Sequence, residues 1–242
     1  MAQISITHRR RIRRTARSAK LKRRVHPVIA FSGLDGSGKS SQARWLAEAL
    51  AERGVDARVY YLPLGHHPIQ RLFRRLRRRA RAKRTSGGSL VKDTAAGKAT
   101  ILVHLWTTLL ALAYALTYRW VVVRSRSRGQ VAIFDRYVLD ARAQMRYFYG
   151  ERRDLGLQGQ LLALLSPHAR AYLLDVAPQT ALARKQDQYD LKQLERQAAL
   201  LRVEAENLGV VRLAGDSPAA ELRRTIVEDI LPLLGSSAIS RR

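Results

Sequence analysis

Apolar residues along the 242-residue chain fall into short continuous runs separated by longer stretches with helical spacing. Short apolar runs bounded by turn residues are typical of strands that are buried on both faces. Five such runs predict five strands, and helical segments lie between them. This order predicts an α/β fold in three layers, α/β/α, around a five-stranded parallel sheet. The predicted strands are 28–31, 57–61, 130–134, 169–176 and 210–213.

The helices between these strands are marked by apolar spacing and by their end signals. Gly54 is expected to stop the first helix at about Arg53, and Pro178 is expected to open another at its first turn. The last helix is expected to end at about Leu234. The predicted helical segments are 42–53, 69–84, 138–149, 156–165, a helix from 178, 190–208 and a final helix to 234.

Residues 99–118 contain no charged side chain. Their length reaches the roughly 20 residues that a bilayer requires. His104 and several Thr and Tyr side chains favour a helix in the protein core, or at a subunit interface, over a transmembrane span. The basic flank that includes Arg119 and Arg124 keeps association with a membrane open.

The net charge of +26 is concentrated in two segments. Residues 1–24 hold ten Lys and Arg, residues 71–84 hold nine, and neither segment contains an acid. Residues 1–26 therefore read as a flexible basic arm, because like charges repel and little apolar surface is present. Both segments could bind an anionic partner, either nucleic acid or a membrane surface. The arm could equally be a solvated tail, and 69–84 a solvated helix that caps an anionic pocket.

The chain contains no cysteine, which excludes disulfides, thiolate catalysis and metal sites built on cysteine. The first 24 residues lack the apolar core of a secretory signal. Both observations suit a reducing compartment, and we expect a cytoplasmic protein.

The stretch GLDGSGKS at 33–40 fits the phosphate-loop pattern between a predicted strand and a predicted helix. Glycines let the backbone N–H groups turn toward anionic phosphates at the helix N-terminus. Lys39 is expected to reach the β and γ phosphates, and the Ser40 hydroxyl to ligate Mg²⁺. The sequence therefore predicts binding of a nucleoside triphosphate. The candidate binding residues are Gly33, Asp35, Gly36, Ser37, Gly38, Lys39, Ser40 and Ser41.

Asp135 and Arg136 follow the third predicted strand, at the edge where α/β folds place ligand chemistry. Asp135 could hold Mg²⁺ directly or through water. Arg136 could grip a phosphate through two hydrogen bonds. The alternative is an ion pair at the surface, with no role in chemistry.

These segments together resemble the thymidylate kinase family of P-loop nucleoside monophosphate kinases. The resemblance covers about residues 27–234 and leaves 235–242 as a tail. Its specific parts are 31–42 and the Asp-Arg-Tyr of 135–137, with weaker support from 173–179 and from 183–196, which lies where the family has a lid.

The resemblance implies transfer of the γ-phosphoryl of ATP, with Mg²⁺, to dTMP or another small acceptor. It implies that Asp35 faces the acceptor sugar, that Asp135 acts near the metal and that Arg136 holds the acceptor phosphate. The stretch Asp35-Gly36-Ser37 offers no basic side chain where some family members have one, so Arg184 and Lys185 of the lid are expected to neutralise the transferring phosphoryl group. The family also suggests a homodimer through the apolar helix near 100–120.

The sequence departs from the family mainly on the acceptor side. Ser32 replaces the usual Glu, 62–67 replaces an Arg-Glu-Pro-Gly-Gly loop, and Asp140 replaces the usual Ser. The place of an Asp-Arg pair falls near 113–114, which reads Ala-Tyr. Two hypotheses follow: a kinase whose acceptor pocket has changed, or a P-loop module that its basic arm and helix dock on nucleic acid or membrane.

Overall fold

The computed structural model describes residues 26–62, 93–150, 154–184 and 190–234. Its sheet has the strand order β2-β3-β1-β4-β5, and every neighbouring pair is parallel. The predicted five-stranded parallel sheet is thereby confirmed, with ends that differ from the prediction by one or two residues. The strands are β1 Val28–Gly33, β2 Ala57–Tyr61, β3 Val131–Asp135, β4 Arg170–Asp175 and β5 Val211–Ala214.

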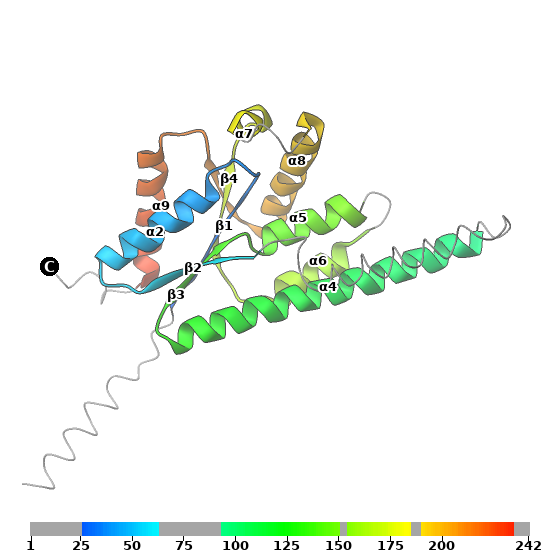
Figure 1. Ribbon diagram of the computed structural model, residues 1–242. Coiled ribbons are helices and arrows are strands. Elements are labelled where there is room, and N and C mark those ends of the chain that lie inside the picture. The colour runs from blue at the N-terminus through cyan, green and yellow to red at the C-terminus, as the bar shows by residue number, and fades with distance from the viewer. Residues whose placement is uncertain (1–25, 63–92, 151–153, 185–189, 235–242) are drawn as a thin grey trace, which may run out of the picture.

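Helices cover both faces of this sheet, as a three-layer fold requires (Figure 1). Successive side chains of β1 point to opposite faces. Ala30 packs among residues of α4, α5 and α6, whereas Ile29 and Phe31 pack among residues of α2 and α9. The helices are α2 Lys39–Glu52, α4 Asp93–Ser127, α5 Val138–Tyr149, α6 Gly156–Leu165, α7 Pro178–Arg184, α8 Leu191–Leu208 and α9 Ala219–Leu234.

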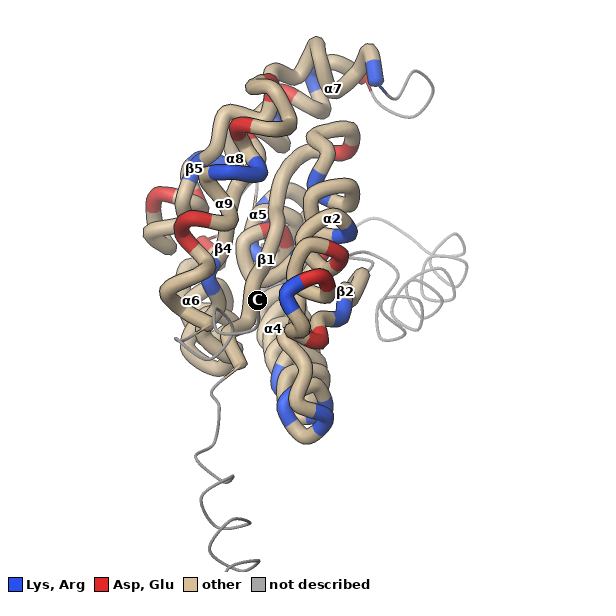
Figure 2. The backbone as a smooth tube through the Cα atoms, turned by 90° about the vertical axis from the view of Figure 1, so that its left-hand side faces the viewer, with Lys and Arg blue, Asp and Glu red and all other residues tan. Residues whose placement is uncertain are grey.

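Helix α4 is longer than the apolar run that predicts it. It spans 35 residues and includes the basic flank, whose residues gather at its carboxyl end (Figure 2). One face enters the core through Leu110, Tyr114 and Tyr118. Leu105 and Leu116 on the other face are each 66% exposed. By length and composition Ile101–Ser127 could cross a membrane, but 39% of its most apolar part is buried within the protein.

The strand register brings the two sequence motifs together at one edge of the sheet. Phe31 of β1 and Tyr61 of β2 are both in register with Asp135 of β3. The phosphate loop follows β1 and Arg136 follows β3, so both lie at the carboxyl ends of adjacent strands.

Several predicted segments lie outside the described residues. These are nearly all of the arm at 1–26, the basic helix at 69–84, all but the first residue of the loop at 62–67, and the tail at 235–242. The division of the chain into an arm, a domain and a tail stays a prediction.

Candidate active site

The loop between β1 and α2 has the backbone shape that its glycines allow. Gly38 precedes α2 in the left-handed region, with φ 86°. Gly36 lies against α7 so closely that a Cβ atom there would be 2.7 Å from the Ala181 carbonyl oxygen. Side chains at either position would therefore strain or displace the loop.

Lys39 is the first residue of α2, and its side chain turns back over the loop. The Nζ atom donates to the Leu34 carbonyl oxygen at 2.9 Å and to Asp35 Oδ1 at 3.2 Å. Burial, and then the nearby Arg136 charge, lower the pKa of Lys39. A buried ammonium beside the loop can form charge-assisted hydrogen bonds with phosphate oxygens.

Ser40 and Asp135 lie side by side and form a candidate Mg²⁺ site. The Ser40 hydroxyl donates to Asp135 Oδ2 at 2.5 Å. Asp135 Oδ1 is buried without a hydrogen-bond partner among the described residues. This oxygen set fits Mg²⁺, which is usually held by one or two carboxylates together with waters and substrate phosphates. The parts of the chain that the structure describes contain no cluster of three His, Cys, Asp or Glu that could bind a metal without such help.

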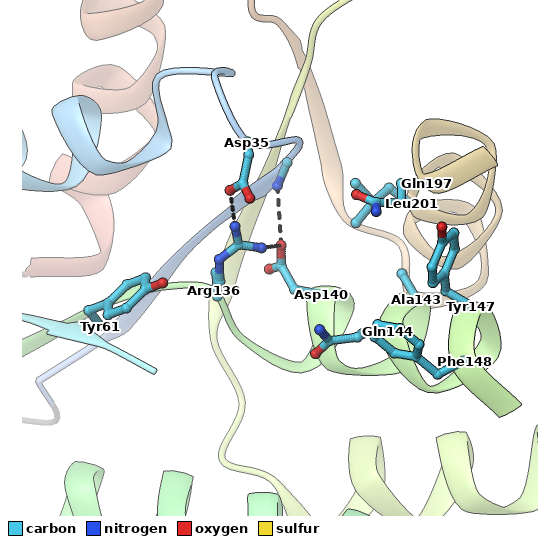
Figure 3. Close-up of a pocket in the computed structure, with 11 residues that line it drawn as sticks. Asp35, Tyr61, Arg136, Asp140, Ala143, Gln144, Tyr147, Phe148, Gln197 and Leu201 are labelled. Atoms are coloured by element: carbon cyan, nitrogen blue, oxygen red, sulfur yellow. Dashed lines mark hydrogen bonds and ion pairs between the residues drawn. The ribbon is translucent and has the colours of Figure 1, made fainter. Parts of the chain in front are cut away.

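Arg136 lies between two carboxylates (Figure 3). It forms an ion pair with Asp35, and its Nη1 is 3.7 Å from Asp140 Oδ1. Burial lowers the pKa of Arg136, but the carboxylates of Asp140 and Asp35 outweigh this effect and the pKa is raised. The backbone of Arg136 has φ 77°, a left-handed conformation that costs a non-glycine residue about 1–2 kcal/mol. Such strain is concentrated at functional sites.

Two adjacent pockets open at this edge. The loop pocket, of about 610 Å³, is lined by the phosphate loop together with Arg184. The helix pocket, of about 230 Å³, lies over α5 and α8. Asp35, Tyr61 and Arg136 line both pockets, so the two spaces share one wall.

The predicted loop residues divide between these pockets. Gly36, Gly38, Lys39, Ser40 and Ser41 line the loop pocket together with Asp35. Gly33 lines the helix pocket instead. Ser37 does not line either pocket; it is buried in the turn, where its N–H donates to the Leu34 carbonyl oxygen at 3.0 Å.

Arg184 at the end of α7 reaches the phosphate loop. Its Nη1 donates to the Gly36 carbonyl oxygen at 3.3 Å, and its Nη2 is 3.7 Å from Asp216 Oδ1. The lid arginine is thus beside the loop pocket, where the sequence predicts a cation. Lys185, the second predicted lid cation, lies outside the described residues.

The helix pocket contains five aromatic or amide side chains that the sequence does not single out. Tyr61 ends β2, so the rule that identifies Asp135 at the end of β3 could also have identified Tyr61. The residues on α5 follow Asp140 at helical spacing on one face. Gln197 comes from α8, and no sequence signal connects it with α5. The five are Tyr61, Gln144, Tyr147, Phe148 and Gln197.

The family's Asp-Arg place on α4 has no counterpart in the helix pocket. Tyr114 is 3% exposed and packs in the core, with its ring 6.3 Å from that of Tyr118. None of the described residues that line the helix pocket belongs to α4.

This fold and edge define the class of the protein: an α/β P-loop nucleotide-binding protein with two adjoining pockets at the carboxyl ends of its strands. No family model matches the chain. Curated relatives do. It is 29% identical to the thymidylate kinase of Symbiobacterium thermophilum over 220 residues, which cover 84% of the chain and 94% of the relative. It is 27% identical to that of Chlorobaculum tepidum over 89% of the chain and 94% of the relative, and 30% identical to that of Ruegeria pomeroyi over 64% and 66%.

Several curated thymidylate kinases are 26–30% identical to the chain over most of its length, which supports a divergent member of that family. It is a nucleoside monophosphate kinase-like enzyme that uses ATP with Mg²⁺.

Proposed function

We propose that this enzyme transfers the γ-phosphoryl group of ATP to dTMP or a closely related small acceptor. The observation that carries the proposal is the wall of Asp35, Tyr61 and Arg136 that the loop pocket and the helix pocket share. A donor phosphate in one pocket and an acceptor phosphate in the other would meet at this wall. Transfer between two bound substrates depends on such close placement.

The basic side chains of the two pockets have proposed roles. Lys39 and Arg184 neutralise the charge of the transferring group, and Arg136 holds the acceptor phosphate. An oxygen of that phosphate attacks the γ phosphorus, the bond to the β-phosphate oxygen breaks, and ADP leaves. Mg²⁺ held by Ser40 and Asp135 would neutralise the charge that develops on the β and γ phosphates.

The helix pocket supports an acceptor with a planar, hydrogen-bonding ring. Tyr147 and Phe148 offer aromatic surfaces, while Gln144 and Gln197 offer amide donors and acceptors. Aromatic surfaces stack on bases, and amides pair with base edges. The curated relatives named as thymidylate kinases favour dTMP among such acceptors.

The acceptor is tested by a panel assayed with ATP and Mg²⁺, following the release of ADP. We expect dTMP to give the highest kcat/KM among nucleoside monophosphates, nucleosides and sugar phosphates. Thymidine serves as the matched control, because it lacks only the phosphate that Arg136 is proposed to hold. Activity with thymidine but not with dTMP would refute the proposed acceptor class. Absence of ADP release with every acceptor would refute the kinase function.

We also propose a homodimer that buries the exposed face of α4. Leu105, Leu109, Leu112 and Leu116 recur there at spacings of four and three residues, as in a helix–helix seam. All four are exposed, and an exposed apolar surface of this kind marks an interaction site. The leucine stripe of one copy can pack against the same stripe of a second copy, as a two-fold interface requires.

The dimer proposal predicts a change of mass on mutation. The wild type is expected at twice 27.4 kDa in size exclusion with light scattering, and the Leu109→Arg, Leu116→Arg double variant at 27.4 kDa. Leu233→Arg on α9, where the native side chain is 46% exposed, is the control and should remain dimeric. A wild type that is monomeric at about 50 μM would refute the proposal.

Docking on nucleic acid or a membrane through 1–24 and 71–84 stays a prediction from sequence. Both segments lie outside the described residues. Deleting 1–24 should abolish any steeply salt-dependent binding to DNA or anionic vesicles if the arm is the contact.

A further inference from the structure

Asp140 is the most buried charged group beside the reaction wall that the proposed mechanism does not use. It is the third residue of α5, and its side chain is 3% exposed. Burial raises the pKa of Asp140, and the Arg136 charge opposes this effect. A buried carboxylate lowers the stability of the fold unless opposite charges and hydrogen-bond donors compensate for its loss of hydration.

The two oxygens of Asp140 connect three separate backbone segments. Oδ1 accepts from the Gly33 N–H at 3.4 Å and is 3.7 Å from Arg136 Nη1. Oδ2 accepts from the Tyr137 N–H at 3.2 Å, at the start of α5. One carboxylate therefore links the end of β1, the residues after β3 and the first turn of α5.

Among the described residues, two carboxylates can orient the Arg136 guanidinium: Asp35, which accepts a hydrogen bond from Nη2, and Asp140, whose Oδ1 is 3.7 Å from Nη1. The backbone N–H of Arg136 donates to the Phe31 carbonyl oxygen at 3.0 Å, which sets the backbone only. Asp35, its other carboxylate partner, also binds Lys39 and belongs to the loop. Asp140 is held in place by helix α5, and it faces a different nitrogen of the guanidinium from the one that Asp35 binds (Figure 3).

We infer that Asp140 is a positioning residue that holds the Arg136 guanidinium in the orientation that receives the acceptor phosphate. The inference rests on the proposed role of Arg136 in acceptor binding. A guanidinium binds phosphate best through two parallel N–H groups, so its orientation affects affinity as well as its charge does. The serine that the family usually has at this place carries no negative charge that could attract the Arg136 guanidinium.

The test is a double-mutant cycle on the dissociation constant of dTMP, measured by calorimetry. Asp140→Asn is nearly isosteric and is expected to weaken dTMP binding about tenfold. In the Arg136→Lys background, where no fork remains to be oriented, the same change should weaken binding by less than about twofold. The KM of ATP should stay within about twofold of the wild type, because Asp140 does not line the loop pocket.

The matched control is Asp229→Asn. Asp229 accepts two hydrogen bonds from Arg170, each 2.6 Å, where β4 begins and far from the wall. Its change should leave dTMP affinity unaltered. An equal loss of dTMP affinity in both Arg136 backgrounds, or no loss in either, would overturn the inference for Asp140.

Failure of the proposed acceptor can be told apart from failure of this inference. A wild type that does not bind dTMP refutes the proposed acceptor. The coupling between Asp140 and Arg136 is then measured from the melting temperatures of the variants without ligand. Arg136→Gln should lower the melting temperature by several degrees, and by clearly less in the Asp140→Asn background. Equal decreases in the two backgrounds would show that the two side chains are not coupled.

Discussion

Alanine in place of Lys39 is expected to reduce phosphoryl transfer by about 10³-fold or more while the protein stays folded. Lys39 lines the loop pocket, and among the described residues its Nζ donates to Leu34 and Asp35 oxygens, which a phosphate oxygen can replace. The positive charge is needed where negative charge develops on the transferring group. Initial rates of ADP release at saturating ATP and dTMP measure the effect.

The fold should tolerate this change. Because burial lowers the pKa of Lys39, the charged side chain opposes folding more than it supports it. We expect the melting temperature of Lys39→Ala to shift by less than about 4 °C. Arg128→Ala, at an exposed position before β3, is the charge-matched control and should keep wild-type turnover. A Lys39→Ala variant with normal turnover would remove the phosphate loop from the mechanism.

Asparagine in place of Asp135 is expected to lower kcat by about 10²–10³-fold. The change preserves the size of the side chain and allows a hydrogen bond to Ser40, so it removes the charge more than the shape. Mg²⁺ binds neutral amides more weakly than carboxylates. In the same variant, the Mg²⁺ concentration that gives half-maximal activity should also rise.

A titration of activity with MgCl₂ separates metal binding from other defects. Asp56→Asn, at the opposite edge of the sheet with Gln130 as its partner at 2.9 Å, should titrate like the wild type. If Asp135→Asn has normal turnover and an unchanged Mg²⁺ requirement, the assignment of Asp135 to the metal is wrong.

The donor side could be predicted from the sequence because its chemistry is local. A phosphate loop needs glycines, a lysine and a hydroxyl within eight consecutive residues, between a strand and a helix. Asp135 could be predicted because a buried apolar run fixes where the strand ends. The structure places Lys39, Ser40 and Asp135 together, as those local rules require.

The second pocket could not be predicted in the same way, because its residues come from distant segments. Gln144 on α5 and Gln197 on α8 have no shared motif, and only the packing of α5 against α8 brings them together. The length of α4 was also underestimated by the apolar run. Arg124 and Arg126 occupy its last turn, where positive charges stabilise the helix dipole, so the basic flank continues the helix.

The wall shared by Asp35, Tyr61 and Arg136 has a consequence for inhibition. One compound could occupy both pockets if a chain of phosphates, rather than a long spacer, joined its two nucleoside ends. Such a compound would compete with ATP and with the acceptor at once, and the two binding free energies would combine in a single molecule. Selectivity over other kinases would then come from the Gln144 and Gln197 end, because the phosphate-loop end is built from features that many nucleotide-binding proteins share.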